Sequence, residues 1–78
     1  MTRILLLGPA REAAGVRNDE LSGETVAEVL DAAVARYGNE FGKVLAVSQV
    51  WVNSEPVDPT SRVGPYDEVV VLPPISGG

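Results

Sequence analysis

The chain has 78 residues, and its 11 acidic and 6 basic side chains give a formal net charge of −5 at pH 7. This length suffices for one small domain with a single core. The sequence contains no cysteine and no histidine, which excludes a disulfide framework, a Cys/His zinc site, a thiol nucleophile and a histidine general base. A small domain without disulfides depends on its core and on partners.

Targeting and nucleic-acid signals are weak throughout the sequence. No uninterrupted apolar run is longer than that at residues 4–7, which is far too short to cross a bilayer. The first residues lack the apolar region and cleavage site of a signal peptide, so we expect a soluble cytoplasmic protein. The basic residues form no stripe along the sequence, and a net negative charge repels phosphate backbones. We therefore expect no nucleic-acid ligand and no membrane association.

The first quarter of the chain predicts a strand, a helical turn and a second strand. Residues 2–7 are rich in isoleucine and leucine and end at Gly8-Pro9, as expected for a strand closed by a turn. Good helix formers at residues 10–15 follow a proline and end at a glycine, which is enough for one helical turn. Residues 16–21 can return as a strand, and their polar composition suits an exposed edge.

The main helix is predicted at residues 26–37. Thr25 occupies the N-cap position with Glu28 three residues later, which is the capping-box pattern, and Gly38 follows the last turn. Helical spacing places one apolar stripe on this segment. The stripe consists of Val26, Val29, Leu30, Ala33 and Tyr37.

The second half of the chain predicts two more strands. Residues 39–45 can form a short turn, and residues 47–53 read as a strand that ends at a polar turn. Pro56 and Pro59 predict an irregular segment, and residues 68–72 form the last strand before Pro73-Pro74. A single amphipathic helix needs a sheet to bury its stripe. The fold class is therefore α+β, with a mixed sheet of four to five strands, one main helix across one face, a domain at residues 1–73 and a tail at residues 74–78.

The C-terminal tail is the most informative segment. A diproline favours extended backbone, so Pro73-Pro74 should direct the chain away from the sheet. The last six residues can then reach ~20 Å, which is enough to enter a deep cleft in another protein. Gly77 and Gly78 have no side chains, so they can pass through a narrow channel.

The α-carboxylate of Gly78 is the candidate reactive group. A carboxylate is a poor acyl donor until it is activated, so an activating enzyme is required. The alternative is that Gly77-Gly78 has no function and is a frayed terminus or an expression remnant. The context favours a function, because the glycines follow a strand, a rigid diproline and Ile75-Ser76 in a domain with no other candidate reactive group.

Three motifs carry a resemblance to a known family. They are the tail Pro73-Pro74-Ile75-Ser76-Gly77-Gly78, the pair Arg11-Glu12 followed by Gly15, and the segment Ala46-Val47-Ser48-Gln49. With them, nearly the whole chain resembles the ubiquitin-like sulfur-carrier (MoaD/ThiS) family, and most closely the small subunit of molybdopterin synthase. One departure is Tyr66, which stands where this family usually has a glycine, so the turn should differ in backbone shape or in its contacts.

This resemblance implies a β-grasp fold and a carrier that is not catalytic alone. Gly78 would be adenylated by an E1-like enzyme that uses ATP, and a sulfurtransferase would supply the sulfur of a terminal thiocarboxylate. The tail would enter the large subunit of molybdopterin synthase, in an expected heterotetramer, and give its sulfur to cyclic pyranopterin monophosphate. No cofactor or metal is expected on the chain itself, and a terminal thiocarboxylate needs no side-chain thiol.

Strand alternation predicts a docking face. It places Val50 and Val52 on one side of their strand and Trp51 on the other. Together with Leu7 and Leu72, Trp51 then forms an apolar patch beside the tail, which favours partner binding by Leu7, Trp51, Leu72, Pro73, Pro74, Ile75 and Ser76. The alternative is that Trp51 belongs to the core and the alternation is shifted by one residue.

Other functions remain open from the sequence. The same terminal chemistry can serve thiamin thiazole or cysteine synthesis, and the large partner that copurifies would distinguish them. A protein modifier conjugated through Gly78 to target lysines is another possibility, although the single Lys43 leaves little scope for chains built on itself. A purely structural binding module would retain its function without Gly77 and Gly78.

Overall fold

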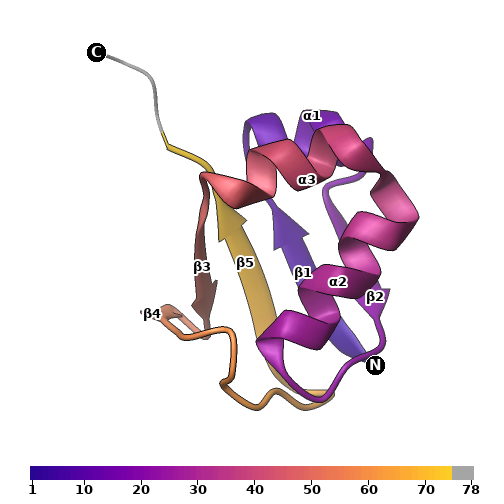
Figure 1. Ribbon diagram of the computed structural model, residues 1–78. Helices are drawn as coiled ribbons and strands as arrows, with labels where there is room; N and C mark the ends of the chain where they lie inside the picture. The colour runs from indigo at the N-terminus through magenta and orange to yellow at the C-terminus, as the bar shows by residue number, and fades with distance from the viewer. Residues whose placement is uncertain (75–78) are drawn as a thin grey trace.

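The computed structural model describes residues 1–74, and this part of the chain forms five strands and three helices (Figure 1). In chain order they are β1 (Thr2–Leu6), α1 (Pro9–Ala14), β2 (Asn18–Leu21), α2 (Val26–Tyr37), α3 (Asn39–Ala46), β3 (Gln49–Val52), β4 (Glu55–Pro56) and β5 (Glu68–Leu72). No helix within this range is long and apolar enough to span a membrane.

The strands form one mixed sheet in the order β2-β1-β5-β3-β4. The last strand, β5, lies at the centre, parallel to β1 and antiparallel to β3. In Figure 1, α2 crosses in front of the sheet, while α1 and α3 lie toward the end where β1 and β5 finish. This is the β-grasp arrangement, so the predicted α+β class and the mixed sheet with one main helix across one face are confirmed.

The core lies between the sheet and the helices. Alternation in β1 and β5 directs Ile4, Leu6, Val69 and Val71 toward the helices, and all four side chains are fully buried. The helices contribute five more buried side chains, with Val29 of α2 at the centre of its stripe, and Leu21 of β2 and Val63 of the loop before β5 complete the core. The complete buried cluster is Ile4, Leu6, Ala10, Leu21, Val26, Val29, Ala33, Phe41, Val63, Val69 and Val71.

The start of α2 follows the predicted cap. The Thr25 hydroxyl accepts a hydrogen bond from the Glu28 backbone N–H at 3.2 Å, and Glu28 Oε1 accepts one from the Glu24 N–H at 3.0 Å. Two further N–H groups of the first turn, those of Val26 and Ala27, donate to carbonyls at Ser61 and Pro59. The loop that follows β4 therefore satisfies the helix end and is itself fixed by it.

Three predictions for the second half of the chain were wrong. The segment after Gly38 is the eight-residue helix α3 rather than a turn, because Phe41 is fully buried and makes an edge contact with Tyr37 at a centroid distance of 5.1 Å. The strand β3 begins only at Gln49, since the N–H groups of Val47 and Ser48 still donate to carbonyls of α3. The segment expected to be irregular contains the short edge strand β4, where a proline is tolerated.

Candidate functional site

The open face of the sheet, opposite the helices, carries a row of apolar side chains. Leu5 of β1 pairs with Val70 of β5, and Val70 pairs with Trp51 of β3. Their neighbours Val50 and Val52 pair with the buried Val71 and Val69, so the alternation predicted from the sequence is confirmed. Trp51 therefore lies on the open face and not among the core residues.

A second group of side chains extends this row toward the C-terminal end of β5. Leu72 follows the same alternation as Val70, and Leu7 follows the last residue of β1. We call Leu5, Leu7, Trp51, Val70 and Leu72 the outer patch; all five are half-buried. The predicted patch contained Leu7, Trp51 and Leu72, and the same alternation identifies Leu5 and Val70 as its remaining members.

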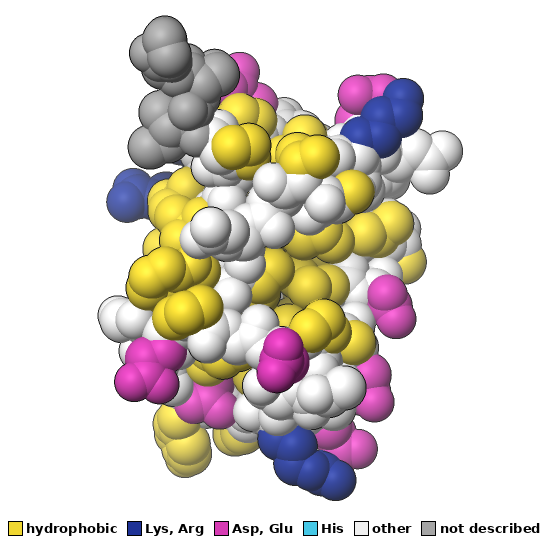
Figure 2. Space-filling model, turned by 60° about the vertical axis from the view of Figure 1, so that its left-hand side comes forward, with side chains coloured by type: hydrophobic (Ala, Val, Ile, Leu, Met, Phe, Trp, Pro, Cys, Tyr) yellow, Lys and Arg dark blue, Asp and Glu magenta, His cyan; other side chains and the backbone are white. Residues whose placement is uncertain are grey.

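The outer patch continues into an open hollow of about 790 Å³ at the base of the tail. The lining residues are Leu7, Gly8, Pro9, Val47, Gln49, Leu72, Pro73 and Pro74. Val47 is 66% exposed, and its place here was not predicted, because the sequence pattern assigns it to a strand rather than to the junction of α3 and β3. Figure 2 shows hydrophobic side chains gathered on the side of the molecule where the described chain ends.

Trp51 is held in place on the open face by its own strand. It is half-buried, and its indole Nε1 donates to the Gln49 side-chain oxygen at 3.1 Å. Residues two apart on a strand share a face, which brings these two side chains together. An ordered, partly exposed tryptophan is well suited to anchor a partner, because little side-chain freedom remains to be lost on binding.

The base of the tail lies at the end of the central strand. Pro73 is half-buried and Pro74 is exposed, and Figure 1 shows the chain leaving the sheet directly beyond β5. Ile75, Ser76, Gly77 and Gly78 lie outside the described residues, so their assigned roles stay predictions. What the structure describes is a diproline that leaves the fold beside the outer patch.

The opposite end of the sheet contains a turn at residues 64–67. The Asp67 carboxylate accepts hydrogen bonds from the Asn53 side chain and the Gly64 N–H, both at 2.8 Å, and these bonds hold the pKa of Asp67 below its usual range. Tyr66 is 98% exposed. Asn53 and Ser54 are the only non-glycine residues with positive φ in residues 1–74, so the turn accommodates Tyr66 without left-handed backbone.

The same described range contains no group of three acidic side chains arranged to hold a metal ion. The acidic residue of this turn instead has a structural role, since both oxygens of Asp67 are used by neighbouring donors. The open face and the base of the tail are therefore the features of the described chain that point to a function.

The geometry of a β-grasp domain with an apolar open face can be compared with known proteins. The profile of the ThiS family matches residues 4–78. The chain belongs to the ThiS family of ubiquitin-like sulfur carriers. A search of curated protein sequences finds no match.

Solved structures with the same fold include three informative relatives of this ThiS-family chain. SAMP1 from Haloferax volcanii is 26% identical, with a TM-score of 0.83 over 99% of this chain and 98% of that one. A chain of the BexX/CysO complex from Amycolatopsis orientalis is 22% identical, with a TM-score of 0.85 over 100% of both chains. A chain of the complex of subunits 1 and 2 of the molybdopterin-converting factor from Helicobacter pylori is 20% identical, with a TM-score of 0.72 over 99% of this chain and 97% of that one.

Proposed function

We propose that this ThiS-family protein carries sulfur as a thiocarboxylate on Gly78 and is the small subunit of molybdopterin synthase. In the first step, the Gly78 carboxylate attacks ATP to form an acyl adenylate and pyrophosphate on an E1-like enzyme. The persulfide of a sulfurtransferase then displaces AMP to form an acyl disulfide, and a thiol reductant cleaves this disulfide to leave the terminal thiocarboxylate. In the last step, the large subunit receives the tail and transfers the sulfur to cyclic pyranopterin monophosphate.

The observation that carries the proposal is the outer patch beside the base of a tail that ends in Gly77-Gly78. A carrier of this kind needs a surface by which other enzymes hold it and a narrow end that reaches their active sites. The apolar open face supplies the first, and a side-chain-free terminus after a diproline supplies the second. All residues that act on the substrate then belong to the partners, which we expect in the cytoplasm.

A second candidate is a protein modifier joined through Gly78 to lysines of other proteins. SAMP1 of Haloferax volcanii is a small archaeal modifier protein, and its two structures, at 26% and 24% identity, support this candidate. A carrier for cysteine or thiamin thiazole synthesis is a third, and the BexX/CysO complex supports a partner-bound protein of this fold. We favour the molybdopterin role because of the diproline and the Arg11-Glu12 turn.

The mass of the intact protein tests the chemistry of the tail. After incubation with an E1-like enzyme, ATP and a sulfur donor, we expect a mass gain equal to the exchange of one oxygen for one sulfur. Removal of Gly77 and Gly78 should abolish the gain, as should one extra residue at the C-terminus. Circular dichroism should show an unchanged fold in both variants. A wild-type chain that gains no mass would contradict the sulfur-carrier proposal.

Addition of a large subunit separates the candidate pathways. Thiocarboxylated protein mixed with the large subunit of molybdopterin synthase should convert cyclic pyranopterin monophosphate to the dithiolene product. A chain that forms the thiocarboxylate but gives no product would retain the carrier chemistry and refute the molybdopterin role. Isopeptide linkage of Gly78 to many cellular proteins would instead support the modifier.

A further inference from the structure

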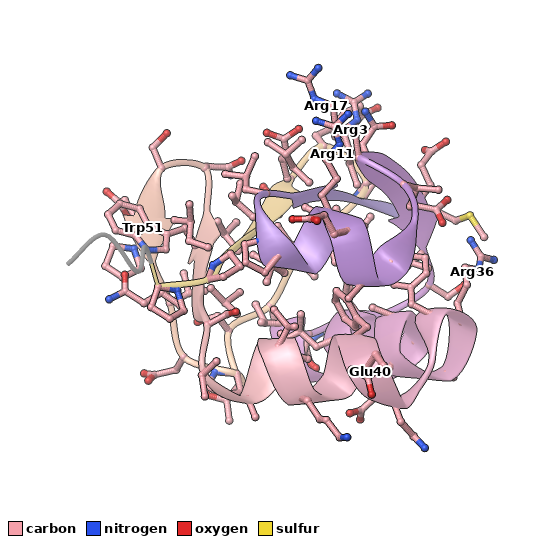
Figure 3. The ribbon with its side chains drawn as sticks, turned by 90° about the horizontal axis from the view of Figure 1, so that it is seen from above. Arg3, Arg11, Arg17, Arg36, Glu40 and Trp51 are labelled. Atoms are coloured by element: carbon pink, nitrogen blue, oxygen red, sulfur yellow. The ribbon has the colours of Figure 1, made fainter. Side chains whose placement is uncertain are left out.

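Three arginines lie on the side of the molecule that carries the outer patch. Arg3 shares the open face of β1 with Leu5, and Arg17 lies beside the end of β1, where its carbonyl accepts a hydrogen bond from the Leu6 N–H at 2.8 Å. Arg11 is on α1, which begins two residues after Leu7. All three are exposed, and Figure 3 shows them on the side opposite Glu40 of α3. No sequence pattern indicates this group, because its members are scattered along the chain.

These arginines differ from the cations on the helical side of the molecule. Arg36 forms an ion pair with Asp19 at 2.9 Å, and Lys43 forms one with Glu40 at 3.4 Å. Within residues 1–74, neither Arg11 nor Arg17 forms an ion pair. Their guanidinium groups are therefore available to a carboxylate from outside.

Arg3 is less available than the other two. It pairs in register with Glu20 on one side and Glu68 on the other, and these residues line one polar hollow. Its charge is thus balanced locally, although no ion pair forms within the described residues. Arg11 is followed by Glu12 in α1, but adjacent residues of a helix do not face each other. Arg11 and Arg17 are the unbalanced charges at this border of the outer patch.

Charge complementarity identifies the chemistry of the partner. An exposed guanidinium presents a fork of donors that fits a carboxylate, and charges at the rim of an apolar interface select and orient the partner. The chain as a whole has a net charge of −5 and repels acidic surfaces. We propose that the outer patch docks an apolar protein surface whose Asp or Glu side chains face Arg11 and Arg17. This inference rests on the proposed docking role of the patch and not on the sulfur chemistry of the tail.

Trp51 provides a direct test, because it is the single tryptophan of the chain and part of the outer patch. The probes are two synthetic amphipathic peptides with the same leucines, one with glutamates and one with lysines at the polar positions. The acidic peptide should change Trp51 fluorescence at a lower concentration than the basic one. Two exposed ion pairs correspond to a preference of about fivefold, and added salt should reduce it.

The variant Arg11→Glu/Arg17→Glu should lose this preference for the acidic peptide. Lys43→Glu/Arg62→Glu is the matched control, because it changes the net charge equally at two exposed positions outside the group. Circular dichroism should show that both variants keep the fold. Equal binding of the two peptides to the wild-type chain would overturn the inference, as would an equal loss of preference in both variants.

The result is separate from that of the sulfur-transfer assay. A wild-type chain that prefers the acidic peptide but gains no sulfur would retain the docking inference and refute the carrier chemistry. A chain that gains sulfur but shows no preference between the peptides would support the carrier chemistry and refute the docking inference.

Discussion

Asp19 joins the edge strand β2 to the end of α2. It pairs with the buried Ile4 and so lies on the helix side of the sheet, where the Tyr37 hydroxyl donates to Oδ2 at 2.8 Å and Arg36 Nη1 donates at 2.9 Å. These bonds, with Tyr37 as the largest cause, lower the pKa of Asp19, while burial and the bond to Asp19 raise the pKa of Tyr37. The strand β2, whose residues have low strand propensity, is thus fixed by side-chain contacts from α2.

We expect this contact to be lost in acid. The ordinary pKa of Asp19 is 3.8 and its folded-state pKa is lower, so the unfolded chain binds this proton more readily. The stabilisation is therefore present above about pH 4 and disappears as the pH falls through the folded-state pKa. Asp19→Asn should lower the free energy of unfolding at pH 7 and approach the wild type in acid, as measured by urea unfolding. A constant difference between the two proteins at every pH would contradict this.

At the scale of elements, the predictable parts are those with local signals. The bounds of α2 follow from Thr25, Glu28 and Gly38, and those of β5 follow from a valine run that ends at a diproline. The helix α3 could not be predicted in the same way. Its formation depends on the burial of Phe41 in the core, where α3 packs against α1 and α2, and this burial exists only after the other elements have packed.

Phe41→Ala should therefore destabilise the protein strongly. Replacing a fully buried phenylalanine leaves a cavity and costs about 3–5 kcal/mol, which is a large part of the stability of a small domain. Urea unfolding measures the change. Val47→Ala is the control in the same region, because Val47 is 66% exposed and its loss should cost no more than about 0.5 kcal/mol. A similar effect of both variants would mean that α3 does not depend on Phe41.

At the scale of the whole molecule, alternation predicted which residues share the open face, and the register of β1, β5 and β3 confirmed it. The grouping of Arg3, Arg11 and Arg17 was beyond prediction. It depends on how β1, α1 and the segment before β2 are arranged in the folded chain. No periodic pattern in the sequence indicates that arrangement. The position of Val47 in the hollow at the base of the tail could not be predicted for the same reason.

Trp51→Ala should weaken docking without changing the chemistry of the tail. In the adenylation assay with the E1-like enzyme, we expect KM for the carrier to rise about tenfold with kcat unchanged, as for the loss of an interface anchor. Tyr66→Ala is the matched control, because Tyr66 is also an aromatic residue but lies 98% exposed at the opposite end of the sheet. An equal rise in KM for both variants would refute the outer patch as the docking surface.

The central position of β5 has a mechanical consequence. Its neighbours β1 and β3 hold it by hydrogen bonds along both sides. The chain begins at one end of β1 and leaves at the far end of the parallel β5 (Figure 1). Tension between the two termini therefore loads the β1–β5 ladder in shear, so that its hydrogen bonds share the force instead of opening one after another. A force applied to the chain beyond β5 therefore meets the whole ladder at once, and the domain resists being unravelled.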